Sequence, residues 1–276
     1  MFLCHGTPGS RLNRPDDETT RTLGVRLIVI DRPGCGLSDF LPGRTLLDWP
    51  RDLAAVADSL GLVRFAVVGF SGGGPYVAAT AHELADRVVA AASVAGAGPV
   101  DAPAALAGLS LYRRTACTLA RRAPTLFRAA MGLTNHPGRN PGRFLNKFTG
   151  DLAPSDQAII ARPEIRAKLV ATYAESVRQG LRGVALDLAI AMRPWGFRLD
   201  EIRCPYCIWH GDDDRSTPIA MAKYLAQNIP HCRTAFLPGE GHMFFYDRWP
   251  EILRQLLAVG FGVEEIAYSG SPSPSV

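Results

Sequence analysis

The sequence contains no long apolar run. Its longest stretch without a charged side chain, residues 65–81, is interrupted by four glycines and a proline. A helix that crosses a bilayer needs about 20 consecutive, mostly apolar residues, so we expect no stable membrane insertion. Residues 1–10 also lack the basic segment followed by an apolar core that a secretory signal requires.

Cysteine is scarce and forms no recognisable framework. The six cysteines are scattered, as is usual in a reducing cytoplasm, where we expect this protein to reside. Cys204 and Cys207 have C-x-x-C spacing, but they lie at the start of an expected strand and not at a helix N-terminus, and no second pair completes a metal site. The sequence therefore predicts no metal site, and we expect no cofactor.

Charge of one sign is not in large excess. The 30 basic and 26 acidic residues leave a net charge of +4, which is too balanced for a nucleic-acid-binding domain. Lysine is nearly absent: Lys147, Lys168 and Lys223 stand beside 27 arginines, and with abundant alanine, glycine and proline this indicates a GC-rich coding bias. We expect a small molecule as the partner.

Strand and helix patterns alternate in both end regions of the chain. With 276 residues, 47% of them apolar, the chain suits one large α/β domain. The alternation predicts a doubly wound, mostly parallel sheet with helices on both faces. Expected strands span residues 1–4, 25–30, 64–68, 87–94, 206–210 and 233–237, and expected helices 16–23, 46–60, 76–84, 218–227 and 250–259.

The alternation stops between residues 98 and 199. This segment has no convincing strand pattern and favours helices at 106–122, 125–133, 155–160 and 164–191, with a loop rich in Gly, Pro and Asn at 135–143. We therefore expect three parts, namely a core of residues 1–97 and 200–262, a helical insertion of residues 98–199, and a disordered polar tail of residues 263–276.

A serine lies in a glycine-rich turn between an expected strand and an expected helix. Gly69 and Gly73 flank Ser71 at positions −2 and +2. If the turn forces the serine to positive φ, a side chain at either flanking position would collide with neighbouring backbone. This G-x-S-x-G pattern is typical of a nucleophile elbow, which exposes the hydroxyl at the carboxyl end of the sheet. The alternative is a glycine-rich turn that contains a serine by chance.

An activated serine needs a base and a carboxylate that orients the base. His242 follows the last expected strand in a Gly-Glu-Gly-His loop, and we predict that it is the base. His82, inside an expected helix, and His210, at the end of a strand, are interpreted as structural. Of the three aspartates at 212–214, we predict that Asp214 is the acid and that its two neighbours are solvated or turn-forming.

These residues together resemble the α/β-hydrolase family. The chain order Ser71, Asp214, His242 matches that family, and its G-x-x-D-x-x-x-P pattern points to Asp214 as the acid. The H-G-x-P-G turn at 5–9 and the D-x-P-G-x-G-x-S loop at 31–38 match as well. The resemblance covers the whole chain except the helical insertion and the tail.

The resemblance implies further roles. In this family the oxyanion is held by backbone N–H groups that correspond here to Thr7 and Gly72. His5 and Asp31 would be scaffolding for the first turn. The insertion would be a lid that shapes the substrate pocket. Residues 98–200 carry 15 basic against 7 acidic residues, a net charge of +8. We favour solvated arginine-rich helix faces as the explanation; the alternatives are an anionic substrate or docking on a membrane surface.

At its start, the sequence departs from the family pattern. Family members have two strands before the one that ends in His-Gly, and here only residues 1–4 precede that turn. The strand expected at 25–30 would then be an exposed apolar sheet edge. We therefore expect the N-terminal strands of the fold to be missing, and a protein begun at Met1 to associate or precipitate unless a segment encoded upstream covers this edge.

The resemblance implies a serine hydrolase, with carboxylic esters as the expected substrates. A serine nucleophile excludes the family branches that use aspartate, the dehalogenases and epoxide hydrolases. One alternative is an aminopeptidase of the proline iminopeptidase type, which the loop at 31–38 resembles. That branch holds its substrate amine with an acidic cluster in the lid, and the basic insertion argues against it. Another alternative is a non-catalytic, ligand-binding homologue. Substrate size and oligomeric state are not predicted.

Overall fold

A single sheet of six parallel strands forms the centre of the molecule. The computed structural model describes residues 1–102, 104–134 and 136–262. The strands are β1 (Phe2–Cys4), β2 (Ile28–Val29), β3 (Phe65–Phe70), β4 (Val88–Val94), β5 (Tyr206–Gly211) and β6 (Cys232–Leu237). They lie in the order β2-β1-β3-β4-β5-β6, so the chain winds outwards from β1 in both directions. This is the doubly wound topology predicted from the sequence.

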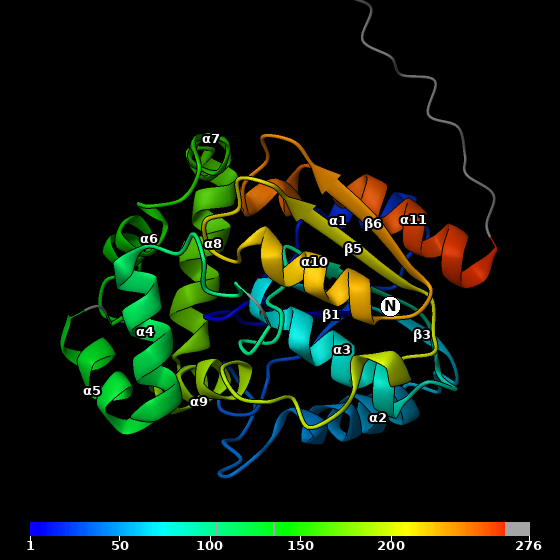
Figure 1. Cartoon of the computed structure of the whole chain (residues 1–276), viewed down its shortest axis with the longest axis horizontal. Coiled ribbons are helices and arrows are strands. Elements are labelled where there is room, and N and C mark those ends of the chain that lie inside the picture. Colours follow the sequence, from blue (N-terminus) through cyan, green and yellow to red (C-terminus); the bar gives the residue numbers. More distant parts are fainter. Residues whose placement is uncertain (103, 135, 263–276) are drawn as a thin grey trace, which may run out of the picture.

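Helices cover both faces of the sheet (Figure 1). Those of the core are α1 (Asp17–Thr22), α2 (Trp49–Ser59), α3 (Gly74–Glu83), α10 (Ile219–Asn228) and α11 (Trp249–Phe261). Because successive strand residues point to opposite faces, Leu3 and Val68 belong to the buried cluster that includes residues of α11, whereas Phe2 and Val67 belong to the one that includes residues of α2, α3 and α10. Every residue of β3 and β4 is buried, as expected of parallel strands covered on both sides.

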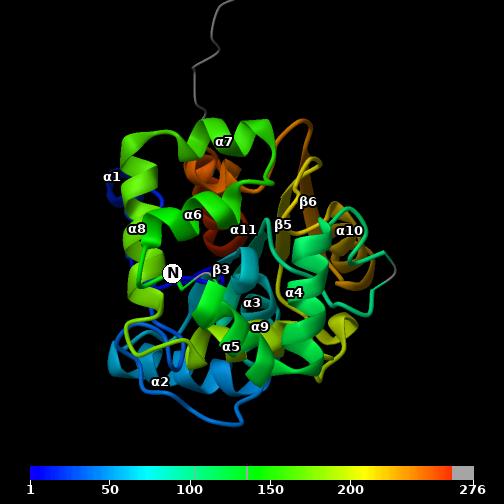
Figure 2. The ribbon, with the colours of Figure 1, turned by 90° about the vertical axis from the view of Figure 1, so that its left-hand side faces the viewer.

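The described chain between β4 and β5 is helical, without a strand. Its helices are α4 (Leu111–Arg122), α5 (Pro124–Thr134), α6 (Pro141–Thr149), α7 (Pro154–Ile160), α8 (Pro163–Ser176) and α9 (Arg182–Ala191). In Figure 1 these green helices gather at the end of the sheet toward which β5 and β6 point, and Figure 2 looks onto them. The helical region thus stands over the carboxyl ends of the strands, where open α/β sheets bind ligands.

Three expectations for the helical region are corrected. The helix expected at 106–122 starts at Leu111, because the Ser110 hydroxyl accepts a hydrogen bond from the Arg113 N–H at 3.4 Å and caps α4. The loop expected at 135–143 extends only to Asn140, because the Asn140 side chain accepts a hydrogen bond from the Arg143 N–H at 2.9 Å and caps α6. Burial of Phe144 and Leu145 then fixes the helix against the core. The single helix expected at 164–191 is two helices, α8 and α9, because the chain turns at Gly180 with a φ of +94°.

The strand expected at 25–30 is shorter than predicted. Only Ile28 and Val29 pair with β1, and β2 forms one edge of the sheet. The Met1 ammonium group donates a hydrogen bond to the carbonyl oxygen of Arg26 at 3.0 Å, which satisfies one acceptor beside this edge. Short edge strands offer little template for pairing with another chain, so the exposed apolar edge is smaller than the sequence suggests.

The six cysteines are free thiols. Burial raises the pKa of Cys204 to about 12 and that of Cys207 to about 11, so neither thiol ionises readily at neutral pH. None of the described helices is long and apolar enough to span a bilayer. The tail expected to be disordered, residues 263–276, lies outside the described residues.

Candidate active site

Ser71 stands in a sharp turn between β3 and α3. Its φ is +56°, in the left-handed region that residues other than glycine rarely adopt. A Cβ atom on Gly69 would lie 2.6 Å from the carbonyl oxygen of Gly73, and one on Gly73 would lie 2.1 Å from that of Cys4. Both positions therefore require glycine, and the turn has the strained backbone of the predicted nucleophile elbow.

Ser71, His242 and Asp214 form a continuous chain of hydrogen bonds. His242 Nε2 lies 2.9 Å from Ser71 Oγ, and His242 Nδ1 lies 2.8 Å from Asp214 Oδ2. The three residues follow β3, β6 and β5, so the parallel sheet brings them together at its carboxyl edge. With the Nδ1–H donating to the carboxylate, Nε2 is left to accept the proton of the serine hydroxyl.

Asp214 is buried and ionised. Its Oδ1 accepts hydrogen bonds from the backbone N–H groups of Ser216 at 2.8 Å and Thr217 at 2.9 Å. Burial alone would raise the pKa of this carboxyl, but the adjacent His242 and these hydrogen bonds outweigh burial and lower the pKa below its ordinary value. A carboxylate that stays charged can orient His242 and stabilise the imidazolium form.

The two neighbouring aspartates have other contacts. Asp212 Oδ1 accepts from the Gly239 N–H at 2.7 Å, and Asp213 forms a solvent-exposed ion pair with Arg215 at 3.0 Å. These contacts agree with the turn-forming and solvated roles expected for them.

His210, interpreted from the sequence as structural, lies directly behind Asp214. Its Nε2 is 2.7 Å from the Thr217 carbonyl oxygen and 3.5 Å from Asp214 Oδ2, and burial lowers its pKa. The Thr217 hydroxyl lies 2.8 Å from both Asp214 Oδ2 and the Ala95 carbonyl oxygen. The helix α10, expected at 218–227, starts one residue later, at Ile219.

Asp156 of α7 supports the His242 loop, and the sequence analysis does not predict it. It is fully buried, and its Oδ1 accepts from the Met243 N–H at 2.6 Å while Oδ2 accepts from the Ala153 N–H at 3.2 Å. A Cβ atom on Gly241 would lie 2.2 Å from Asp156 Oδ2, so glycine there allows the carboxylate to approach. The sequence signal, an acidic residue in the first turn of a helix, indicates a cap but not its distant partner.

The turn after β1 lies directly beside the elbow. The nitrogen of Thr7 is 3.0 Å from the position that a Cβ atom on Gly72 would occupy, so the two residues expected to hold the oxyanion are neighbours. Within the described residues, the Thr7 N–H donates to no protein acceptor. His5 Nε2 accepts from the Arg32 N–H at 3.3 Å and His5 Nδ1 lies 2.9 Å from the Gly6 carbonyl oxygen, which fits a scaffolding role.

Arg32 is buried behind this turn, and its contacts are also absent from the sequence analysis. Its guanidinium donates to the Gly6 carbonyl oxygen and to Thr7 Oγ1, each at 2.8 Å. Its Nε donates to Asp187 of α9 at 2.8 Å, and Asp187 also pairs with Arg44. Burial alone would raise the pKa of Asp187, but the two guanidinium groups lower it to about 2. This network ties the helical region to the turn that carries Thr7.

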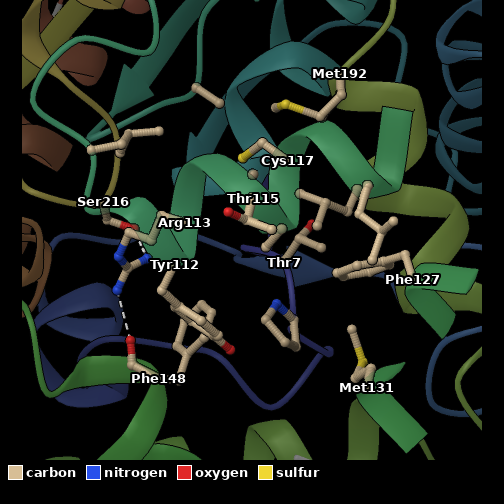
Figure 3. Close-up of a pocket in the computed structure, with 18 of the residues that line it drawn as sticks. Thr7, Tyr112, Arg113, Thr115, Cys117, Phe127, Met131, Phe148, Met192 and Ser216 are labelled. Atoms are coloured by element: carbon tan, nitrogen blue, oxygen red, sulfur yellow. Dashed lines mark hydrogen bonds between the residues drawn. The ribbon is translucent and has the colours of Figure 1, made fainter. Parts of the chain in front are cut away.

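A cavity of about 280 Å³ opens at Ser71, with walls from α4, α5 and α9. Figure 3 shows Thr7 between Arg113 on one side and Phe127 and Met131 on the other. Most residues of the wall are apolar, and none of the described lining residues is an aspartate or a glutamate. This mainly apolar cavity therefore reaches Ser71 and the two residues expected to hold the oxyanion, Thr7 and Gly72.

A second cavity, of about 20 Å³, also reaches Ser71. His242 lines this smaller cavity and, among the described residues, does not line the larger one. The residues common to both walls are Thr7, Pro8, Ser71, Phe148 and Ser216.

Comparison with known proteins gives the family. Residues 1–248 match the alpha/beta hydrolase fold family. The chain belongs to this family. A curated relative of this α/β hydrolase, the 2-hydroxy-6-oxononadienedioate/2-hydroxy-6-oxononatrienedioate hydrolase of Burkholderia vietnamiensis, is 27% identical over 274 residues, covering 93% of this chain and 85% of the relative.

Solved structures agree with this assignment. A thermophilic esterase from Thermogutta terrifontis is 25% identical, with a TM-score of 0.68, covering 93% of this α/β hydrolase and 88% of the esterase chain. The enol-lactonase from Burkholderia xenovorans shares the fold, with 18% identity and a TM-score of 0.68. The match covers 93% of this chain and 90% of the lactonase chain. The family and these named hydrolases and esterases make the protein an enzyme of the hydrolase class.

The described side chains of this α/β hydrolase do not form a metal site. Among the described residues, no group of three or more His, Cys, Asp or Glu side chains is arranged to hold a metal ion. The chemistry that the described groups can carry out themselves is nucleophilic attack by a hydroxyl with proton transfer through an imidazole.

Proposed function

We propose that this α/β hydrolase cleaves carboxylic esters through an acyl-enzyme formed on Ser71. The observation that carries the proposal is the hydrogen-bonded chain Ser71–His242–Asp214 at the mouth of a cavity. His242 takes the proton of Ser71 as Oγ attacks the ester carbonyl, and then gives this proton to the departing alcohol. A water molecule, deprotonated by His242, releases the acid and restores Ser71. Asp214 orients the imidazole throughout.

The backbone N–H groups of Thr7 and Gly72 would hold the negatively charged oxygen of each tetrahedral intermediate. Both residues line the cavity beside Ser71. Loss of one such donor typically lowers kcat by about 10²–10³-fold. Arg32 fixes the Thr7 side of this pair through its bonds to Gly6 and Thr7.

The cavity favours a neutral ester over two other substrates. An aminopeptidase of the proline iminopeptidase type needs carboxylates for the substrate amine, and the described wall has none. A dianion such as the dienedioate in the name of the Burkholderia vietnamiensis relative needs two cationic partners. Arg113 is the one basic residue among the described lining residues, and Asp151 already pairs with it at 2.8 Å. Arg114, Arg121 and Arg122 are exposed, as expected of solvated helix faces.

A fluorophosphonate probe with peptide mass spectrometry tests the nucleophile, and acid release from methyl butyrate in a pH-stat tests the reaction. We expect the probe on Ser71, and loss of both labelling and turnover in Ser71→Ala, while the exposed-serine control Ser59→Ala behaves like the wild type. Labelling that persists in Ser71→Ala contradicts the assignment. A protein that is folded but neither labelled nor active is the non-catalytic homologue.

A further inference from the structure

The two cavities that meet at Ser71 divide an ester into its two parts. The leaving oxygen must receive a proton from His242 Nε2, so it has to lie within hydrogen-bond distance of that atom. Among the described residues, His242 lines only the smaller cavity, whereas of the two proposed oxyanion donors Gly72 lines only the larger one and Thr7 lines both. An ester bound across Ser71 therefore directs its alcohol into the smaller cavity and its acyl chain into the larger.

The sizes of the cavities limit each part. The smaller cavity, about 20 Å³, barely exceeds the roughly 10–15 Å³ that one water molecule occupies, so it admits one or two non-hydrogen atoms. The larger cavity, about 280 Å³, is nearly twice the roughly 150 Å³ space that holds a benzene ring in a protein core. On that scale it has room for about eleven carbon atoms.

Several polar groups in the wall of the larger cavity already have partners inside the protein, whereas the hydroxyl of the half-exposed Tyr112 has none among the described residues. The hydroxyls of Thr115 and Thr134 donate to carbonyl oxygens four residues earlier in their own helices, at 2.8 and 2.7 Å. Arg113 donates to Asp151 at 2.8 Å and to the Phe148 carbonyl oxygen at 2.6 Å. A polar acyl chain would lose its hydration and find few new partners. An apolar chain gains about fourfold in binding for each methylene buried.

We infer that the substrates of this site are esters of a small alcohol, such as methanol, with an apolar acid of about eight to eleven carbons. This inference rests on the proposed function, because it takes Ser71 as the nucleophile and His242 as the proton donor. Its content is the orientation: the long part of the substrate is the acid and the short part is the alcohol.

Two isomeric esters isolate that orientation. Methyl nonanoate and octyl acetate have the same composition and similar hydrophobicity, but one carries the long chain on the acid and the other on the alcohol. We expect kcat/KM for methyl nonanoate to exceed that for octyl acetate by about 100-fold or more, since several methylenes are buried in one orientation and excluded in the other. Both rates are measured by pH-stat below the solubility limit.

A matched pair of variants on α5 tests whether the acyl chain of the substrate lies in the larger cavity. Ala130 lines the larger cavity, whereas its neighbour Ala129 is exposed and is not part of the wall. In Ala130→Phe the ratio of kcat/KM for methyl nonanoate to that for methyl butyrate should fall about tenfold, because the ring fills space needed by the longer chain. Ala129→Phe should leave this ratio unchanged.

The outcomes separate this inference from the proposed function. If the fluorophosphonate labels Ser71 and methyl butyrate is cleaved, the proposed function stands. The inference about the substrate is then overturned if the two isomers are cleaved at equal rates, if octyl acetate is cleaved faster, or if neither is cleaved. It is also overturned if Ala130→Phe leaves the ratio of kcat/KM for methyl nonanoate to that for methyl butyrate unchanged. If Ser71 is not labelled at all, the proposed function fails first and the inference fails with it.

Discussion

Asp187 and Arg32, which lie 155 residues apart in the sequence, form a fully buried ion pair with a distance of 2.8 Å between Oδ2 and Nε. The same guanidinium donates to the Gly6 carbonyl oxygen and to Thr7 Oγ1. One carboxylate from the helical region thus neutralises the cation that fixes the turn carrying Thr7. The position of a proposed oxyanion donor therefore depends on α9.

Asp187→Asn should destabilise the protein strongly. Breaking a buried ion pair by removing one partner leaves an uncompensated charge and costs about 3–5 kcal/mol. Urea unfolding of the variant measures this cost, and kcat for methyl butyrate should fall more than KM rises. Asp200→Asn, in the exposed pair with Arg198, is the control and should change neither quantity. A fully stable Asp187→Asn protein contradicts this account.

The free energy of unfolding should decrease as the pH falls below about 6.5. Burial lowers the pKa of His5 to about 3 and also lowers that of His210. Both pKa values rise to about 6.5 in the unfolded chain, which therefore binds protons that the folded protein does not. The contribution of these two histidines to the free energy of unfolding is therefore complete above that pH. It is lost as the pH falls toward the pKa values of the folded protein.

Urea titrations at pH values of about 8, 6.5, 5, 4, 3 and 2 test this pH dependence. His210→Gln should show a smaller decrease in the free energy of unfolding between pH 6.5 and 5 than the wild type, because one neutral buried histidine has been removed. A second decrease in the free energy of unfolding is expected as the pH falls from 3.8 toward 2, because the lowered pKa of Asp187 is about 2 and its carboxylate becomes protonated there. A wild-type protein equally stable at pH 8 and 5 contradicts the prediction.

Asp214→Asn should fold normally and lower kcat by about four orders of magnitude, because the imidazole loses the partner that fixes its tautomer. Asp213→Asn, which affects only the exposed pair with Arg215, should change kcat little. Asp212→Asn keeps an acceptor for the Gly239 N–H and should also remain active. A larger loss in Asp213→Asn than in Asp214→Asn shows that the acid is misassigned.

The core of the fold and the three residues of the hydrogen-bonded chain could be predicted because their signals are local. Ser71 stands between two required glycines, and Asp214 and His242 each follow a strand. Asp156 and Asp187 could not be predicted, because their partners lie 87 and 155 residues away and no local pattern names a distant partner. The start of α6 does have a local signal, the Asn140 cap, but the surrounding Gly, Pro and Asn residues favour a loop instead.

Asp156→Ala should lower kcat about tenfold or more, with a smaller effect on KM. The variant removes the acceptor for the Met243 N–H, so the loop that carries His242 loses its support, and small displacements of a catalytic group have large effects on rate. Asp156→Asn retains one acceptor oxygen and should lower kcat less than Asp156→Ala does. Equal losses in the two variants, or a loss confined to KM, show that Asp156 does not position His242.

Association through the β2 edge remains a prediction, and Arg26 provides a test. This exposed arginine is the charged residue beside Ile28 and Val29, and charged side chains protect sheet edges from pairing. Arg26→Val should shift the protein toward dimers or larger species in size-exclusion chromatography as its concentration rises. Arg21→Val, on the exposed face of α1, is the control. Identical elution of all three proteins contradicts the prediction.

The contacts of Asp156 and Asp187 restrict how this family member can acquire new specificities. Replacing residues 98–199 with those of another hydrolase would remove Asp156, which accepts a hydrogen bond from the loop of His242, and Asp187, which neutralises two buried arginines. The helical region between β4 and β5 therefore cannot be exchanged as an independent unit. Changes in substrate range are compatible with the core when they alter side chains that face the cavity, such as Ala130, and leave both carboxylates in place.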